Sequence, residues 1–227
     1  MDLELRGKKA IVTMATGATG RAVADLLAAE GADIAFCGAA ADIDSTAAAL
    51  KAAGGAVSGA SVDIRDGAKF KAWLEQAVST LGGCDIFVVN IGLDSGLDET
   101  HSWLSDFEFD VLHTVRGCDT VLPHLKTAGG GAIVILGASA TAGDPKLNSY
   151  SALQAGLVTY SKQLSQFVGR DGTRVNLVAP SPASGTPAEI ARTVVFLASP
   201  AASLVTGAYV VPGVATPGVV TTPQANR

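Results

Sequence analysis

The stretch that decides the fold is KKAIVTMATGATGRAVADLLAAEGADIAF, residues 8–36. It opens with an apolar run at 10–13, which predicts a buried strand. The segment Arg21–Glu30 has apolar residues at helical spacing, and Gly31 follows it as a stop signal for a helix. A second apolar run at 33–37 predicts another strand. A strand, a helix and a strand joined by short turns indicate a parallel βαβ unit.

The same alternation of strand-like and helix-like segments continues along the chain. Further strands are expected at 56–62, 86–90, 132–136, 174–179 and 208–211, with helices at 46–53, 68–81, from about 102, at 148–168 and at 187–197. This order predicts an α/β protein with a Rossmann-type, doubly wound parallel sheet in a single domain. We assign the domain to residues 1–215 and expect residues 216–227, rich in Pro and Thr, to form a flexible C-terminal tail.

Composition restricts the class of protein further. Of the 227 residues, 48% are hydrophobic and 16% are charged, which suits a sheet buried on both faces. The net charge of −5 argues against a nucleic-acid partner. No apolar run reaches the roughly 18 residues of a membrane span, and the first residues lack the pattern of a signal peptide. Three separated cysteines predict reduced thiols and a cytoplasmic protein, and three separated histidines predict no metal site.

Several segments together carry a resemblance to a known family. They are the opening stretch, DIFVVNIG at 85–92, GGAIVIL at 130–136, SYSALQAGLVTYSKQLS at 149–165, RVNLVAPSP at 174–182 and EIARTVVFLASPAASLVTGAYVVPG at 189–213. With these segments in order, the chain resembles the short-chain dehydrogenase/reductase family along nearly its whole length. The resemblance implies a Rossmann fold, a nicotinamide cofactor and the interconversion of a carbonyl and an alcohol.

The resemblance places a dinucleotide site at the first turn, where the family has TGxxxGxG. Here the turn is TMATGATG, so Met14 and Ala18 replace the first two glycines of the motif. Thr13, Gly17 and Gly20 remain as candidate cofactor contacts, although both glycines also suit an ordinary helix-entry turn. We expect the Met14 side chain to fold back and fill the nucleotide groove.

Other cofactor positions are partly kept. Asp63 matches the acid that contacts adenine in the family, and Asn90 and Gly92 match part of the segment that lines the cofactor groove. No acid or arginine directly follows the second strand, where the family contacts the ribose. Asp42 and Asp44 come later and are expected to cap a helix. We therefore expect either no cofactor or weak binding of NAD(P), with no assignment between NAD and NADP.

The family's catalytic set of Asn, Ser, Tyr and Lys is altered. Tyr150 aligns with the tyrosine that transfers the proton, but Gln154 replaces the lysine one helical turn later. The serine position falls on 137–138, so Ser139 is a displaced substitute, and Asp110 replaces the asparagine. A lysine charge about 4 Å away lowers the pKa of a tyrosine by roughly 3 units. Without it, Tyr150 is expected to stay protonated at neutral pH and to be a poor general base.

Three hypotheses about function follow. In the first, the chain is a non-catalytic or regulatory subunit that associates with an active short-chain dehydrogenase. The resemblance implies a homo- or hetero-oligomer, formed through the helices at 102–125 and 148–168 and through the last strand. In the second, the chain is an NAD(P)-dependent oxidoreductase that uses Tyr150 with Gln154 and Ser139. In the third, it catalyses a non-redox reaction such as elimination or dehalogenation, although an arginine in place of Gln154 would suit that chemistry better.

Overall fold

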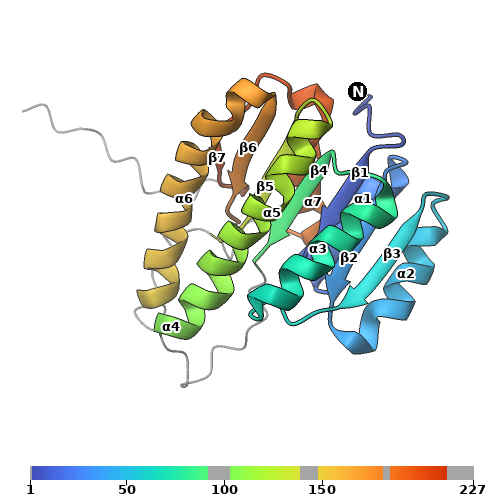
Figure 1. The fold of residues 1–227 in the computed structure, drawn as a ribbon, viewed down its shortest axis with the longest axis horizontal. Helices are drawn as coiled ribbons and strands as arrows, with labels where there is room; N and C mark the ends of the chain where they lie inside the picture. The colour runs from blue at the N-terminus through green and yellow to red at the C-terminus, as the bar shows by residue number, and fades with distance from the viewer. Residues whose placement is uncertain (1, 92–102, 139–147, 181–184, 214–227) are drawn as a thin grey trace, which may run out of the picture.

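The computed structural model describes residues 2–91, 103–138, 148–180 and 185–213. These residues form an α/β domain around a parallel sheet of seven strands, in the order β3-β2-β1-β4-β5-β6-β7 (Figure 1). The strands are β1 (Lys9–Val12), β2 (Asp33–Gly38), β3 (Val57–Ser61), β4 (Ile86–Asn90), β5 (Gly131–Leu136), β6 (Thr173–Val178) and β7 (Tyr209–Val210). Neighbouring strands are parallel throughout, which confirms the predicted Rossmann-type, doubly wound sheet.

Helices cover both faces of the sheet. They are α1 (Ala18–Ala29), η1 (Ala40–Asp42), α2 (Ile43–Lys51), α3 (Gly67–Leu81), α4 (Trp103–Asp106), η2 (Phe107–Leu112), α5 (His113–Thr127), α6 (Asn148–Val168), η4 (Gly169–Asp171), α7 (Pro187–Ala198) and η5 (Pro200–Ala202). One layer consists of α1, α2 and α7, and the other of α3, α5 and α6 (Figure 1). A parallel sheet requires this cover, because each crossover helix returns along one of its faces.

Each face of the sheet has its own hydrophobic core. Val12 and Phe36 belong to the core beneath α1 and α7, while Ile11 and Cys37 belong to the core beneath α3, α5 and α6. All four side chains are fully buried. Adjacent residues of a strand face opposite sides of the sheet, so a strand that is buried on both faces must be apolar throughout. The unbroken apolar runs of the sequence have this origin.

Local signals set the ends of α3. Its N-cap residue is Asp66, whose carboxylate accepts hydrogen bonds from the backbone N–H groups of Ala68 at 3.2 Å and Lys69 at 3.1 Å. Gly82 ends the helix with a φ of 71°, in the left-handed region that glycine adopts without a Cβ clash. The helix predicted at 68–81 is therefore confirmed, with both of its ends explained by the sequence.

The helix expected from about residue 102 is not uniform. Its described part begins with α4, continues through the wide π-helical turn η2, and only then becomes α5. Asp106 and Asp110 are both buried here, with 7% and 3% of their surface exposed, whereas Leu104 is 79% exposed. A π-helical turn is rare and occurs frequently at functional sites. A search for a period of 3.6 residues does not predict it, because the inserted turn breaks that period.

The first turn of α1 lies very close to the ends of β1 and β4. A Cβ atom on Gly20 would collide with the carbonyl oxygen of Met14 and with Nδ2 of Asn90. Asn90 Nδ2 donates a hydrogen bond to that same carbonyl over 3.1 Å. Only glycine permits this approach of backbone to backbone. The contact lies between β1 and β4, where the strand order reverses and where α/β sheets bind ligands.

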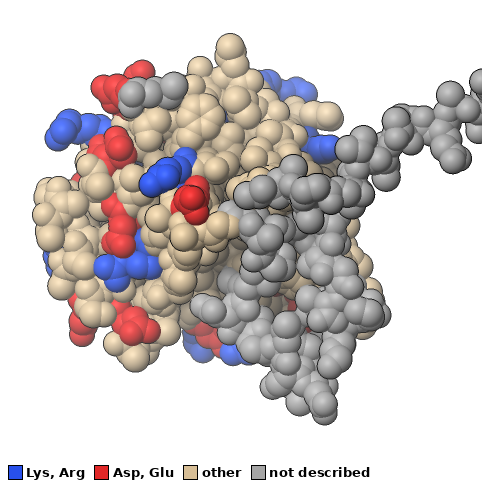
Figure 2. Space-filling model, turned by 180° about the vertical axis from the view of Figure 1, so that it is seen from behind, with Lys and Arg blue, Asp and Glu red and all other residues tan. Residues whose placement is uncertain are grey.

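Three further findings concern the described residues. None of their helices is long and apolar enough to cross a membrane. No group of three or more His, Cys, Asp or Glu side chains among them could hold a metal ion. On the face that Figure 2 shows, the described acidic and basic side chains are interspersed, so that face has no continuous basic surface for nucleic acid.

Gly20→Ala is expected to lower the free energy of unfolding by about 2 kcal/mol, because the added methyl group overpacks against backbone and the Asn90 amide. Gly169→Ala is the matched control, since a Cβ there meets no atom within 4 Å. We expect it to change stability by less than about 0.5 kcal/mol. Urea denaturation followed by circular dichroism measures both variants. Equal stability of the two would contradict the close approach of α1 to β1 and β4.

Candidate functional site

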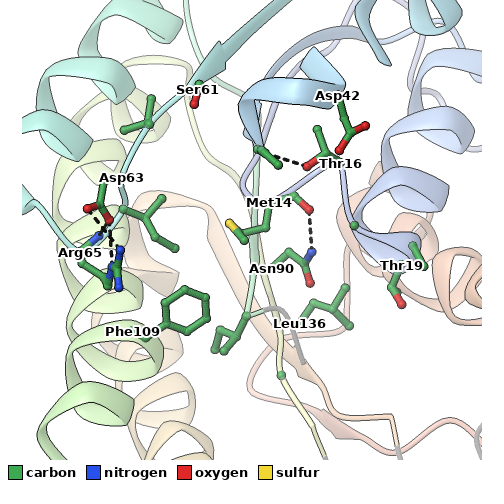
Figure 3. Close-up of a pocket in the computed structure, with 18 of the residues that line it drawn as sticks. Met14, Thr16, Thr19, Asp42, Ser61, Asp63, Arg65, Asn90, Phe109 and Leu136 are labelled. Atoms are coloured by element: carbon green, nitrogen blue, oxygen red, sulfur yellow. Dashed lines mark hydrogen bonds and ion pairs between the residues drawn. The ribbon is translucent and has the colours of Figure 1, made fainter. Parts of the chain in front are cut away.

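A groove of about 750 Å³ lies along the carboxyl ends of the strands (Figure 3). Its walls come from the turn after β1, the segments after β2 and β3, the ends of β4 and β5, and Phe109 of η2. In open α/β sheets the crevice beside the reversal of strand order is the usual ligand site. The groove therefore occupies the place at which the sequence predicts a nucleotide.

Met14 forms part of the groove wall and has a strained backbone. Its φ is 50°, in the left-handed region that costs a residue with a Cβ atom about 1–2 kcal/mol. The turn thus keeps a backbone conformation that suits glycine, although the residue is methionine. The side chain lines the groove without filling it, so the expectation that Met14 closes the groove is wrong.

The candidate cofactor residues fall into two groups. The residues that line the groove are Gly17, Asp63 and Asn90. Thr13 is fully buried behind the groove, where its Oγ1 accepts a hydrogen bond from the Asn90 N–H at 2.9 Å and so joins β1 to β4. Gly20 also lies behind the turn, where it allows the close approach described above. Gly92 lies outside the described residues.

Asp63 shares the rim of the groove with Arg65. The Arg65 Nε donates to Asp63 Oδ1 over 3.0 Å, and the Arg65 backbone N–H donates to the same oxygen over 3.1 Å. These hydrogen bonds from Arg65 hold the pKa of Asp63 below its usual value. The pair is exposed and adds little to stability. The ion pair instead changes the local charge, because the Arg65 guanidinium neutralises the Asp63 carboxylate at this part of the groove.

The residues that follow β2 make different contacts from those that the sequence predicts. Thr16 Oγ1 accepts a hydrogen bond from the Ala39 N–H at 2.9 Å and joins the first turn to β2. Asp42, expected to cap a helix, is the N-cap residue of α2 but makes no side-chain capping hydrogen bond, and Asp44 lies within that helix. Asp42 lines the groove instead (Figure 3). Asp42 therefore occupies the predicted cap position of α2 without the capping hydrogen bond, and Asp44 is an acid in the first turn of that helix.

Gln154 is buried, with 1% of its surface exposed, and connects the end of β5 to η2. Its Oε1 accepts a hydrogen bond from the Ala138 N–H at 3.1 Å, and its Nε2 donates to Asp110 Oδ2 over 3.3 Å. The same Oε1 occupies the space that a side chain on Gly137 would need. The two positions at which the resemblance expects lysine and serine therefore contact each other. Neither carries a group that transfers protons at neutral pH.

Tyr150 lies one helical turn before Gln154 in α6. Its hydroxyl is buried and has no hydrogen-bond partner among the described residues. Burial, followed by the charges of Asp110 and Asp106, raises the pKa of Tyr150 above its ordinary value. The structure thus groups Tyr150 with Gln154 and Asp110, in surroundings that stabilise the protonated phenol. Ser139 lies outside the described residues.

The groove-lining residues that the sequence analysis did not single out include Thr16, Arg65 and Phe109. Arg65 follows Asp63 so closely in the sequence that their pairing could have been inferred. No sequence pattern indicated that Phe109 lies at the groove, because its position depends on the π-helical turn η2. The contact of Thr16 with the end of β2 depends on the path of the first turn, which the motif does not specify.

Met14→Gly is expected to be more stable than Met14→Ala by about 1 kcal/mol. Both variants lose the side chain, but only glycine relieves the left-handed backbone. Urea unfolding of the two proteins side by side measures the difference. If the alanine variant were as stable as the glycine variant, Met14 would not hold a positive φ in solution.

Tyr150 is expected to remain protonated at pH 10, where an ordinary tyrosine is half ionised, because its pKa is raised. The ultraviolet absorbance of the phenolate measures this, and subtracting the titration of Tyr150→Phe isolates the residue. Gln154→Lys is expected to lower the pKa of Tyr150 by up to about 3 units. Gln154→Met, which adds no charge, is the control. A Tyr150 signal that titrates below pH 10 in the unchanged protein would contradict the burial of its hydroxyl.

Comparison with known proteins agrees with the family resemblance found in the sequence. The family model for short chain dehydrogenases matches residues 8–193. The cis-4-hydroxycyclohexanecarboxylate dehydrogenase of Sinomonas cyclohexanicum is 32% identical, over 88% of this chain and 92% of its own. A 3-oxoacyl-[acyl-carrier-protein] reductase of Vibrio harveyi is 30% identical, over 90% of this chain and 95% of its own. A hydroxysteroid dehydrogenase from Escherichia coli has the same fold, with a TM-score of 0.85 at 24% identity over 93% of this chain and 98% of its own. The chain belongs to the short-chain dehydrogenase/reductase family.

Proposed function

We propose that the protein is a non-catalytic member of this family that serves as a structural or regulatory subunit beside an active short-chain dehydrogenase. The observation that carries the proposal is the buried Gln154, whose carboxamide binds Ala138 and Asp110 at the position of the family's lysine. A neutral side chain that is held by two hydrogen bonds supplies no charge to Tyr150.

The state of Tyr150 supports the same conclusion. Oxidation of an alcohol needs a base near the hydroxyl, and a tyrosine serves as one only as a phenolate. With an ordinary pKa near 10, about one tyrosine in a thousand is ionised at pH 7. Burial and the two aspartates reduce this fraction further, because they raise the pKa. Gly137, at one of the two positions that match the family's serine, has no room for a side chain, because Gln154 Oε1 fills the space beside it.

The groove residues nevertheless fit the dinucleotide that the family implies. Gly17 is the N-cap of α1, so the free N–H groups of that helix face the groove, where they suit a pyrophosphate. Asp63 and Asn90 both line the groove, and the family resemblance would place adenine beside Asp63. A bound nicotinamide would supply hydride transfer. On this chain's side, Tyr150 would offer only a protonated hydroxyl.

Exposed apolar side chains support association with another subunit. Trp103 and Leu104 of α4 are 57% and 79% exposed, and Phe167 of α6 and Leu204 after η5 are 72% and 98% exposed. Among the described strands, β7 pairs with β6 alone and leaves one edge open. Apolar patches and open strand edges are surfaces that subunit contacts cover.

A second candidate is an oxidoreductase that reduces a carbonyl with Tyr150 as the proton donor. The open groove favours it, since a volume of about 750 Å³ remains at the nucleotide position. Relatives named as dehydrogenases and reductases also favour it. A tyrosine that stays protonated is better suited to donate a proton than to accept one, so this candidate favours reduction over oxidation.

With millimolar NADH or NADPH and a panel of ketones and 3-oxoacyl thioesters, the purified chain is expected to show no hydride transfer above the buffer rate. Tyr150→Phe should give the same baseline. Tyr160→Phe is the matched control, because it removes a buried hydroxyl from the same helix that lies beside Cys118 and not beside Asp110. Turnover that Tyr150→Phe abolishes and Tyr160→Phe keeps would overturn the proposal in favour of the oxidoreductase.

The subunit role is tested by co-expression with an active family member from the same organism. Affinity purification followed by light scattering is expected to yield a complex of fixed stoichiometry. Elution of the two chains as separate species would contradict this role.

A further inference from the structure

We infer that three side chains at the start of α5 are positioning residues, which hold η2 in its π-helical form and so fix what η2 presents to the groove and to Gln154. These side chains are His113, Thr114 and Arg116. The turn η2 places Phe109 at the groove and Asp110 beside Gln154 (Figure 3). The inference does not depend on the proposed function, since the same contacts would place Asp110 in a chain that transfers hydride.

The backbone of η2 makes a wider turn than an α-helix. The His113 N–H donates to the carbonyl of Glu108, whereas an α-helix would join it to the carbonyl of Phe109, one residue later. Converting the wide turn into an α-helix would shift the residues before it by one position, a rotation of about 100° around the helix axis. Such a rotation would move Asp110 away from the Gln154 carboxamide, to which it is bound over 3.3 Å. The place of Asp110 therefore depends on the π form.

Two carbonyls of η2 are bound by side chains of α5. The imidazole Nδ1 of His113 lies 3.0 Å from the Phe109 carbonyl oxygen, and it must carry the proton of this bond, because a carbonyl only accepts. The imidazole thus takes the carbonyl that the His113 N–H leaves when it turns to Glu108. The Thr114 hydroxyl donates to the next carbonyl, that of Asp110, over 2.7 Å.

His113 has no other hydrogen bond among the described residues. Its side chain is fully buried with its ring 5.2 Å from that of Phe70, and its Nε2 has no hydrogen-bond partner. Burial lowers the pKa of His113 to about 4, so the ring is neutral at pH 7. A buried polar atom without a partner costs stability. The contact with η2 is therefore the polar role that the structure gives this histidine.

Arg116 joins η2 to the rim of the groove. Its guanidinium donates to the Glu108 carboxylate of η2 and, over 3.5 Å, to the backbone carbonyl of Arg65. It also lies against Gly67 at the start of α3, where a Cβ atom would be 2.9 Å from the Arg116 Nε. The side chain of Arg65 in turn holds Asp63 at the rim. The Arg116 guanidinium thus fixes η2 relative to the segment after β3.

Three variants test the inference. Thr114→Val removes one hydrogen bond to η2 and keeps the shape of the side chain. Thr120→Val is the matched control, because the Thr120 hydroxyl makes the same kind of bond over 2.7 Å, but to the Arg116 carbonyl within the regular part of α5. Arg116→Gln removes the contact with Glu108. Its side chain is 36% exposed, so this variant is expected to fold.

Hydrogen exchange measures η2, and the ionisation of Tyr150 measures its effect. In Thr114→Val the His113 N–H is expected to exchange about fivefold faster or more, with no such change in Thr120→Val. In Thr114→Val and Arg116→Gln the phenolate absorbance of Tyr150 should appear at a pH lower by about 1 unit or more. The reason is that the charge of Asp110 moves away and water enters, and both changes lower the raised pKa of Tyr150. Subtracting the same variant with Tyr150→Phe isolates this signal, and circular dichroism confirms the fold at each pH.

The direction of the change in Arg116→Gln separates positioning from direct electrostatics. Loss of a cation alone disfavours a phenolate and would raise the pKa of Tyr150, whereas release of η2 lowers it. An unchanged or raised pKa of Tyr150 in either folded variant would overturn the inference, as would an equal change in Thr120→Val. If Thr114→Val did not fold, Arg116→Gln would decide alone. Hydride transfer by the unchanged chain, in contrast, would overturn the non-catalytic role and leave the positioning of η2 intact.

Discussion

The contact between the first turn of α1 and the ends of β1 and β4 is the constraint on which the rest of the molecule depends. Gly20 lies against the Met14 carbonyl, and the Asn90 amide donates to that carbonyl over 3.1 Å. Behind it, Thr13 joins the same two strands through its hydroxyl. Together these contacts fix the distance between α1 and the sheet where the strand order reverses. The groove exists because the helix begins there, with its free N–H groups directed into the gap.

This contact also explains how the turn persists after the loss of a motif glycine. Met14 keeps a φ of 50°, at a cost of about 1–2 kcal/mol, because the surrounding hydrogen bonds hold its carbonyl in place. A local substitution has been absorbed as backbone strain without collapse of the groove. The first turn thus keeps the groove open although a methionine occupies its left-handed position.

The cluster around Gln154 is held together by hydrogen bonds instead of by backbone strain. Gln154 satisfies the Ala138 N–H and the Asp110 carboxylate, and its oxygen occupies the space beside Gly137. A side chain at position 137 would displace this hydrogen-bonded carboxamide, so the residues at 137 and 154 depend on each other. The groove at the carboxyl ends of the strands therefore stays open, while the cluster around Gln154 is closed by its own hydrogen bonds.

The sequence by itself determined the family, the seven strands, the parallel doubly wound sheet and the end of α3 at Gly82, because periodicity and glycine stop signals act over a few residues. It also singled out Met14 and Gln154 as positions that differ from the motifs of the family it resembles. Only the tertiary structure decided what these residues do. The partners of Gln154, the π-helical turn that buries Asp110, and the presence of Asp42 at the groove all depend on contacts between segments far apart in the chain. Local patterns do not encode such contacts, since each depends on how the helices pack against the completed sheet.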